Sequence, residues 1–277
     1  MIPSKLGIIA GSGNLPLALA THAANEGRDV FIVGIEGFAE TSLLDKFKHS
    51  VISIGEVGRQ ISSLKQAGVE EVCFAGIVKR PDFKSLKLDS KGVLLLPKVI
   101  RAASQGDDAL LRVLVSTLEK VGFKVVGADE VLGSLLAPKG ALGKFSPSSK
   151  DIEDIDKAAD IAAQIGKLDI GQGAVVCDGL VLAVEAQEGT DLMLQRCAEL
   201  PDNLLGTVKH PKGVLVKRPK PGQERRIDLP TIGLKTLEGI KNANLAGIAV
   251  EAHAALILDK EQLIAYADTN NIWIYGF

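Results

Sequence analysis

Aromatic residues and long apolar runs are both scarce in this sequence. Phenylalanine, tyrosine and tryptophan together make up 4% of 277 residues, so the core must be mostly aliphatic. No stretch reaches the roughly 18 uninterrupted apolar residues that a membrane-spanning helix needs. Glycines and a proline break the apolar run near the N-terminus. We therefore interpret that run as a strand and a turn rather than as a signal peptide.

Neither a charge excess nor a cysteine framework is present. The 32 Lys and Arg residues nearly balance 34 Asp and Glu residues, and the net charge is −2. This balance excludes a globally basic nucleic-acid binder and argues against disorder. Cys73, Cys177 and Cys197 form no CxxC pair, which argues against a disulfide framework and a structural zinc site. We expect buried, reduced thiols in a cytoplasmic protein.

Strand and helix patterns alternate over the first 130 residues. This order predicts an α/β fold with a Rossmann-like, doubly wound parallel sheet. The expected strands are residues 5–10, 30–35, 51–54, 72–75 and 123–126, and the expected helices are residues 15–26, 55–65 and 107–120.

Residues 131–150 interrupt the alternation and are rich in Pro, Gly, Ser and Lys, so we predict a linker there. Residues 151–277 then predict a second, mixed α/β domain. In it Asp178 and Gly179 favour a tight hairpin turn. The expected helices are residues 151–165, 190–199 and 260–268, and the expected strands are residues 174–177, 180–185, 213–216, 245–250, 255–258 and 272–275.

A glycine-rich turn joins the first strand to the first helix. Gly11, Gly13 and Asn14 lie where backbone N–H groups at a helix N-terminus hold a phosphate. Pro16 replaces the third glycine of a GxGxxG motif, which argues against a dinucleotide-binding site. Glu36 favours one, because it lies where an acid that binds the ribose is expected. The alternatives are phosphate or ligand contact and a purely structural turn.

A second turn follows the strand at residues 72–75. Gly76 ends that strand, and Lys79 and Arg80 come next, at the edge where open α/β sheets bind ligands. The two cations are candidates for phosphate contact. The alternative is a pair of exposed basic residues beside a turn.

Charge is segregated in the second domain. Residues 168–195 hold five acids and no base, and residues 209–226 hold seven bases and one acid. Within the acidic block, a strand leads into a helix through Gly189. Oxygen-bearing side chains at such a junction suit Mg²⁺ or hydroxyl recognition, or cap the helix. They are Gln187, Glu188, Thr190 and Asp191.

The basic block is followed by a candidate functional acid. Asp228 lies between Ile227 and Leu229 and follows Arg226 by two residues. An acid in apolar company beside cations is typical of functional sites. The alternatives are a structural aspartate and a solvated basic face.

Several long motifs resemble the UDP-2,3-diacylglucosamine pyrophosphatases of the LpxI type. The resemblance covers nearly the whole chain, and the motifs of the second domain are the more specific. They are Leu168–Val176, Val184–Asp191 and Asp228–Gly233, with Leu6–Pro16, Cys73–Gly76, Arg80–Asp82 and Gly106–Leu111 in the first domain.

The resemblance implies a Mg²⁺-dependent hydrolase of lipid A biosynthesis. Members split UDP-2,3-diacylglucosamine into UMP and 2,3-diacylglucosamine 1-phosphate (lipid X), with water attacking the α-phosphorus. The resemblance also implies a lipid site between two domains and a homodimer. We expect no nucleic-acid partner, and we infer a peripheral contact with the inner membrane.

The catalytic aspartate of the family falls on Asp228, which we expect to bind Mg²⁺ or to orient water. Glu188 and Asp191 would assist the metal. Lys217 and Arg226 would meet phosphate oxygens. We expect further substrate contacts from Gly11, Gly13, Asn14, Gly76, Arg80, Gln187, Gly189, Thr190, Gln223 and Thr231.

Two other functions fit parts of the sequence. The glycine turn and Glu36 favour an NAD(P)-dependent Rossmann oxidoreductase, but no proton donor is evident. A non-catalytic carrier of nucleotide sugars or lipids would bind the same ligand without releasing UMP.

Overall fold

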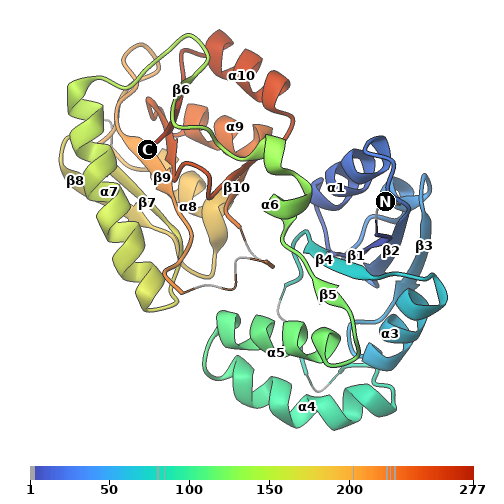
Figure 1. Cartoon of the computed structure of the whole chain (residues 1–277). Helices are drawn as coiled ribbons and strands as arrows, with labels where there is room; N and C mark the ends of the chain where they lie inside the picture. The colour runs from blue at the N-terminus through green and yellow to red at the C-terminus, as the bar shows by residue number, and fades with distance from the viewer. Residues whose placement is uncertain are drawn as a thin grey trace. The chain divides into compact units, whose positions relative to one another are not determined.

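The computed structural model describes residues 4–79, 81–83, 85–201, 203–222, 224, 226–227 and 229–277 (Figure 1). The chain divides into two compact units. The first comprises residues 1–133 and 224–228, and the second comprises residues 134–223 and 229–277. A short segment of the C-terminal half therefore belongs to the first unit. Nothing in the sequence pattern indicates this association.

The first unit is a parallel sheet covered by helices, which confirms the predicted class. Its strand order is β3-β2-β1-β4-β5, and all four neighbouring pairs are parallel, as in Rossmann folds. The elements are β1 (Leu6–Ala10), α1 (Leu15–Asn25), β2 (Val30–Ile35), α2 (Thr41–Leu44), β3 (Lys48–Ile52), α3 (Val57–Gln66), β4 (Glu71–Ala75), α4 (Ser90–Ala103), α5 (Asp107–Glu119), β5 (Lys124–Val125) and α6 (Ala128–Val131).

Strand β1 lies at the centre of this sheet, and all five of its residues are buried. A continuous apolar run is what a parallel strand covered on both faces requires. On one face, Leu64 of α3 and Leu118 of α5 share a core with Ile9 and Val72. Helix α1 covers the other face (Figure 1).

The second unit is built on a six-stranded mixed sheet in the order β6-β13-β11-β9-β7-β8, as predicted for a mixed α/β domain. Strands β9, β11 and β13 run parallel, whereas β7 is antiparallel to both of its neighbours. Residues 131–150 include the 3-10 helix η1 and strand β6, and β6 pairs with β13. The elements are η1 (Gly133–Leu135), β6 (Gly140–Leu142), α7 (Ser149–Lys167), β7 (Gly173–Cys177), β8 (Leu180–Val184), α8 (Gly189–Ala198), β9 (Val214–Lys217), β10 (Thr231–Ile232), α9 (Leu234–Asn242), β11 (Gly247–Val250), β12 (Leu256–Ile257), α10 (Lys260–Thr269) and β13 (Trp273–Gly276).

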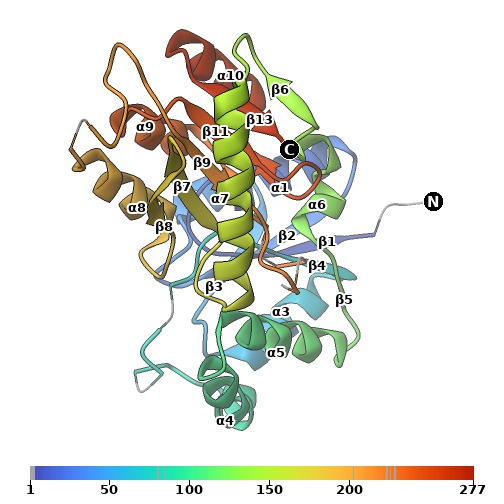
Figure 2. The same ribbon diagram turned by 90° about the vertical axis from the view of Figure 1, so that its left-hand side faces the viewer.

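Helices cover both faces of the second sheet. Helix α7 packs along one face, where Ile155 and Ala158 share a core with Val216 (Figure 2). Helices α8, α9 and α10 line the other face, where Met193 packs in one cluster with Leu215. Within the described part of the chain, no helix has the length and apolar character to cross a membrane.

The hairpin predicted at Asp178 and Gly179 is confirmed. Both residues have positive φ, 50° and 75°, as a type I′ turn requires. Their N–H groups donate to the two carboxylate oxygens of buried Asp154, at 2.9 and 2.7 Å. Helix α7 therefore holds the hairpin turn in place in addition to covering one face of the sheet.

The three cysteines are free and buried, as expected. Burial raises the pKa of Cys73 to about 12 and the pKa values of Cys177 and Cys197 to about 11. Thiols that stay protonated in this way are poor nucleophiles at neutral pH.

We predict that Gly247→Ala lowers the free energy of unfolding by about 2 kcal/mol. A Cβ at Gly247 would lie 2.2 Å from Cδ2 of Trp273, which pairs with Gly247 across β11 and β13 and is buried. Because Trp273 is the one tryptophan of the chain, its fluorescence reports denaturant unfolding directly. Gly133→Ala is the control, since a Cβ there meets nothing within 4 Å. Equal losses in both variants would contradict this packing argument.

Candidate functional site

The two glycine turns of the first unit meet at the carboxyl edge of its sheet. Ser12 N donates to Ile77 O, and Ile77 N donates to Ser12 O, each at 2.9 Å. A Cβ on Gly11 would lie 2.5 Å from Ile77 O, and a Cβ on Gly76 would lie 2.5 Å from Ser12 O. Both glycines are therefore required for this close approach, and the N–H of Ser12 is already used within the fold.

Gly13 and Asn14 form the exposed part of the first turn. Gly13 has φ +91°, and the Asn14 side chain makes no capping hydrogen bond to α1. If this turn binds a phosphate, the geometry favours Gly13 and Asn14 over Gly11 for the contact.

The acidic junction lies in the second unit, between β8 and α8. Arg196 donates to the carboxylate of Glu188 at 3.0 Å, and Lys235 pairs with Asp191 at 2.5 Å. The backbone N–H of Glu188 itself, and then Arg196, hold the pKa of the Glu188 carboxyl below its usual value. Gln187 is exposed beside them. The junction thus presents the carboxylates of Glu188 and Asp191 at the surface, and the lowered pKa of Glu188 keeps that group ionised at neutral pH.

Glu185 and Lys217 flank Gly173 in one row across the second sheet. Each is only 5% exposed. Thr190 Oγ1 donates to Glu185 Oε1 at 2.7 Å, but Glu185 Oε2 is buried without a hydrogen-bond partner among the described residues. Lys217 Nζ reaches Thr231 O at 3.4 Å. Buried charges with so few partners are costly to maintain and are typical of functional sites.

Glu185 is a candidate that the sequence reasoning missed as a site residue. It directly follows the apolar strand β8. A carboxylate at the buried end of a strand is the sequence feature that could have identified it as a site residue. Lys217 was expected from the basic block, and the structure adds that this cation is buried at the end of β9. The two residues come from blocks of opposite charge and lie in one sheet row, on either side of Gly173.

Glu224, Arg226 and Ile227 associate with the first unit through charged groups and one apolar side chain. Glu224 N donates to Asp108 Oδ1 at 2.7 Å. Arg226 donates to both oxygens of Glu224 at 2.8 Å and to Glu119 Oε1 at 2.7 Å. Ile227 packs against the core of the first unit. Arg226, expected at a phosphate, is thus bound by two carboxylates, an arrangement that favours a positioning role.

Three expected site residues, Arg80, Gln223 and Asp228, lie outside the described residues. The neighbours of Asp228 in the chain are informative nonetheless. Ile227 belongs to the first unit, and Leu229 belongs to the second. The chain on either side of residue 228 is therefore held by a different unit.

The metal site expected from Asp228, Glu188 and Asp191 is only partly described. Among the described residues, no three His, Cys, Asp or Glu side chains form a cluster that could hold a metal ion. Magnesium, however, usually binds one or two carboxylates plus substrate phosphate. Surface ion pairs like those of Glu188 and Asp191 are worth about 0–1 kcal/mol, so a cation competes with them at little cost. Glu188 and Asp191 supply the hard oxygen ligands that Mg²⁺ prefers in this form of site.

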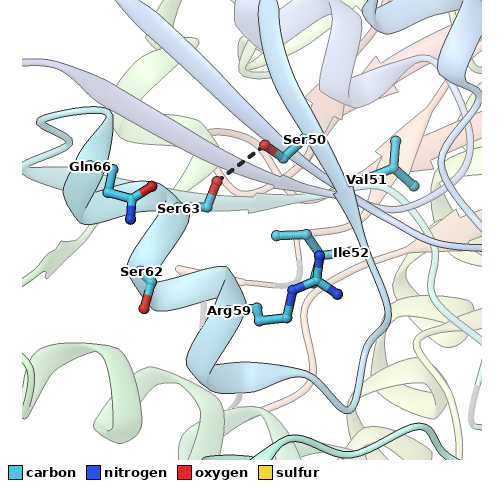
Figure 3. A pocket seen from close by; sticks show the side chains of 7 residues that line it. All are labelled: Ser50, Val51, Ile52, Arg59, Ser62, Ser63 and Gln66. Carbon is cyan, nitrogen blue, oxygen red and sulfur yellow. Dashed lines mark hydrogen bonds between the residues drawn. The ribbon is translucent and has the colours of Figure 1, made fainter.

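A hollow beside β3 and α3 contains none of the expected site residues (Figure 3). Ser63 Oγ donates to Ser50 Oγ at 3.1 Å across it, and Arg59 pairs with Glu56. It offers no cluster of acids or cations for pyrophosphate chemistry. Its lining residues are Ser50, Val51, Ile52, Arg59, Ser62, Ser63 and Gln66.

Two family models together match almost the whole chain. The LpxI N-terminal domain matches residues 5–135, and the LpxI C-terminal domain matches residues 138–275. The chain belongs to the LpxI family. A relative from Caulobacter vibrioides, named UDP-2,3-diacylglucosamine pyrophosphatase LpxI, is 50% identical over 272 residues. The alignment covers 98% of this chain and 97% of the relative, and the resemblance seen in the motifs is confirmed.

The LpxI domain limits and the structural units agree at one boundary and differ at another. The family models change over between residues 135 and 138, close to the structural division at 133 and 134. The LpxI C-terminal model also spans residues 224–228, which the structure groups with the first unit. The sequence family thus assigns this segment to the C-terminal domain although it folds with the other unit.

We predict that Glu224→Gln lowers the free energy of unfolding at pH 7 by about 1 kcal/mol. Hydrogen bonding from Arg226 lowers the pKa of Glu224 from 4.5. A lowered folded-state pKa gives stability that is complete above the unfolded pKa and disappears as pH falls through the folded value. The difference between wild type and variant, measured by urea unfolding, should therefore shrink as pH falls below 4.5.

Glu153→Gln, at an exposed position of α7, is the matched control for this measurement. It should leave the stability nearly unchanged at both pH values. A loss for Glu224→Gln that is the same at pH 7 and at acidic pH would show that the charge of Glu224 does not stabilise the segment.

Proposed function

We propose that this chain hydrolyses the pyrophosphate of UDP-2,3-diacylglucosamine in lipid A biosynthesis. The observation that carries the proposal is the 50% identity, over 98% of the chain, with a relative named for that activity. The two LpxI domain models support it over both halves of the chain. The chain is an enzyme of the LpxI family.

We propose that water attacks the α-phosphorus. The new bond joins the water oxygen to that phosphorus, and the bond from it to the bridging oxygen breaks. The products are then UMP and 2,3-diacylglucosamine 1-phosphate, lipid X, which keeps the bridging oxygen. Such a displacement needs charge neutralisation and orientation rather than a covalent intermediate.

Most of the residues that would meet both requirements lie in the second unit, and Asp228 lies in the segment grouped with the first. Lys217 is buried, and a cation in a low-dielectric site stabilises developing phosphate charge more strongly than an exposed one. Gln187, Gly189, Thr190, Gln223 and Thr231 would position the sugar phosphate or the water. Asp228 would accept the proton of the attacking water or bind the metal.

The first unit would contribute further substrate contacts. Gly13 and Asn14 are exposed at the end of β1, and Arg80 follows the turn at the end of β4. Gly11 and Gly76 would act by allowing the two turns to approach each other. This edge is where open parallel sheets bind ligands.

We propose Mg²⁺ as the cofactor, held by Asp228 together with Glu188 and Asp191. When bound, it would neutralise pyrophosphate oxygens. The support is chemical: the carboxylates are hard oxygen ligands, and Glu188 has a lowered pKa that keeps it ionised.

We also propose a cytoplasmic homodimer in peripheral contact with the inner membrane. The support is the substrate, because a molecule with two acyl chains partitions into a bilayer. A water-facing active site then needs the protein to reach the membrane surface.

We predict that Asp228→Ala lowers Mg²⁺-dependent turnover at least a hundredfold, because removing a general base or metal carboxylate removes transition-state stabilisation. The assay measures UMP release from UDP-2,3-diacylglucosamine, with Mg²⁺ or with a chelator. Asp29→Asn is the control, since that side chain is 87% exposed and belongs to none of the motifs. Unimpaired turnover by a folded Asp228→Ala protein would remove this residue from the mechanism.

We predict that hydrolysis in ¹⁸O-water places the label in UMP, because the attacking oxygen stays on the attacked phosphorus. Mass spectrometry of both products gives the answer. Label in lipid X would instead place attack on the phosphorus nearer the sugar. No UMP at all, despite tight substrate binding, would favour the carrier function.

A further inference from the structure

Helix α4 of the first unit exposes several large apolar residues to solvent. Its buried residues are Gly92, Ala102 and Ala103. Leu94 is 82% exposed, Val93 55% and Ile100 47%. A surface helix normally buries large apolar side chains and exposes small or polar ones. In α4 the small residues are buried and Val93, Leu94 and Ile100 face outward. The other large apolar residues of the helix are half-buried.

The exposed apolar residues form one stripe rather than isolated positions. Val93, Leu94, Pro97 and Ile100 follow the spacing i, i+1, i+4 and i+7, which keeps them on one side of a helix. Pro97 is exposed with them. The α4 stripe, defined by these four residues, is a continuous apolar surface, and such surfaces mark interaction sites.

The start of the helix is firmly fixed, so the stripe is not the result of a loose helix. Asp89 Oδ1 accepts from Gly92 N at 2.8 Å, which caps α4. Asp89 Oδ2 accepts from Arg59 N, also at 2.8 Å, which ties this cap to α3. Figures 1 and 2 both show α4 alongside α5 at the periphery of the first unit.

Basic residues border the stripe. Residues 90–106 contain Lys91, Lys98 and Arg101 and no acid. Lys98 and Arg101 are exposed. Within the described residues, none of the three lies in an ion pair. An apolar stripe bordered by cations complements an anionic lipid surface, where acyl chains meet negative head groups.

We infer that the α4 stripe is the surface by which this protein docks on an anionic bilayer. Val93, Leu94, Pro97 and Ile100 enter the head-group boundary, while Lys98 and Arg101 contact lipid phosphates. The choice of a lipid partner rests on the proposed function, whose substrate carries two acyl chains. The exposure, the spacing and the charges do not depend on it.

A second copy of the chain is a less suitable partner for the same surface. Two α4 stripes facing each other would bring Lys98 and Arg101 of one copy near those of the other. Like charges so placed oppose association. A bilayer surface instead supplies the opposite charge.

Co-sedimentation with vesicles tests the inference in the absence of substrate. The full-length chain is mixed with vesicles of phosphatidylcholine alone or of phosphatidylcholine with phosphatidylglycerol. We expect binding to the anionic vesicles that weakens with added salt. Leu94→Glu should lower the partition coefficient about tenfold, because it removes a leucine and adds a negative charge. Lys98→Glu should lower it about fivefold or more.

Val208→Glu is the matched control, because Val208 is an exposed apolar residue, 87% accessible, in the second unit. It should bind vesicles like wild type. Leu94→Glu should also keep full turnover on substrate in detergent micelles and lose it only on substrate in vesicles.

Three results would overturn the inference. One is equal vesicle binding by wild type and Leu94→Glu. Another is a dimer, seen by size-exclusion chromatography, that Leu94→Glu dissociates, since the stripe would then bind a second copy. The third is an equal loss of turnover in micelles and vesicles, which would assign the stripe a role within the chain. Failure of the proposed hydrolysis would instead appear as no turnover by wild type in micelles, whatever the vesicle binding.

Discussion

The direction of the strands decides where the candidate site residues of this protein lie. Strands that run in the same direction end at the same edge, so the loops that follow them are neighbours whatever their distance in sequence. In the first unit, β1 and β4 end at the two turns that contain Gly11 and Gly76. In the second, β8 and β9 run in the same direction on either side of the antiparallel strand β7, and they end at Glu185 and Lys217. Side chains far apart in the chain are brought together by backbone hydrogen bonding alone.

The segregation of charge along the chain does not survive folding. Lys220 from the basic block pairs with Asp169 from the acidic block at 2.7 Å, and Lys212 lies 3.5 Å from Asp178. Two of the five acids thus pair with the basic block, whereas Glu188 and Asp191 pair with cations outside it. Glu185 is the exception, since one of its oxygens is buried without a hydrogen-bond partner among the described residues. A buried charged residue with an unpartnered atom therefore indicates a functional site more reliably than the number of charges in the surrounding sequence does.

The elements that the sequence predicted well are those whose signal is local. The βα units of the first half and the Asp178 turn depend on apolar runs and on backbone conformations available to few residues. Helix α4 has no such signal, because Gly92 and Pro97 interrupt it and because its most exposed side chains include apolar ones, Val93 and Leu94 among them. The association of residues 224–227 depends on Asp108 and Glu119, which lie more than a hundred residues away. Contacts between residues so far apart in the chain produce no periodic pattern in the sequence from which they could be predicted.

The segment 224–228 means that the chain passes between the two units three times, near residues 133, 223 and 228. A gene fragment that ended at residue 133 would encode the first unit without Ile227, which packs on its core, and without the partners of Glu119 and Asp108. Neither unit is therefore a self-contained block of sequence. Recombination that exchanged one half of the gene would separate the first unit from the segment 224–228 that belongs to it. The two halves are therefore expected to be inherited together.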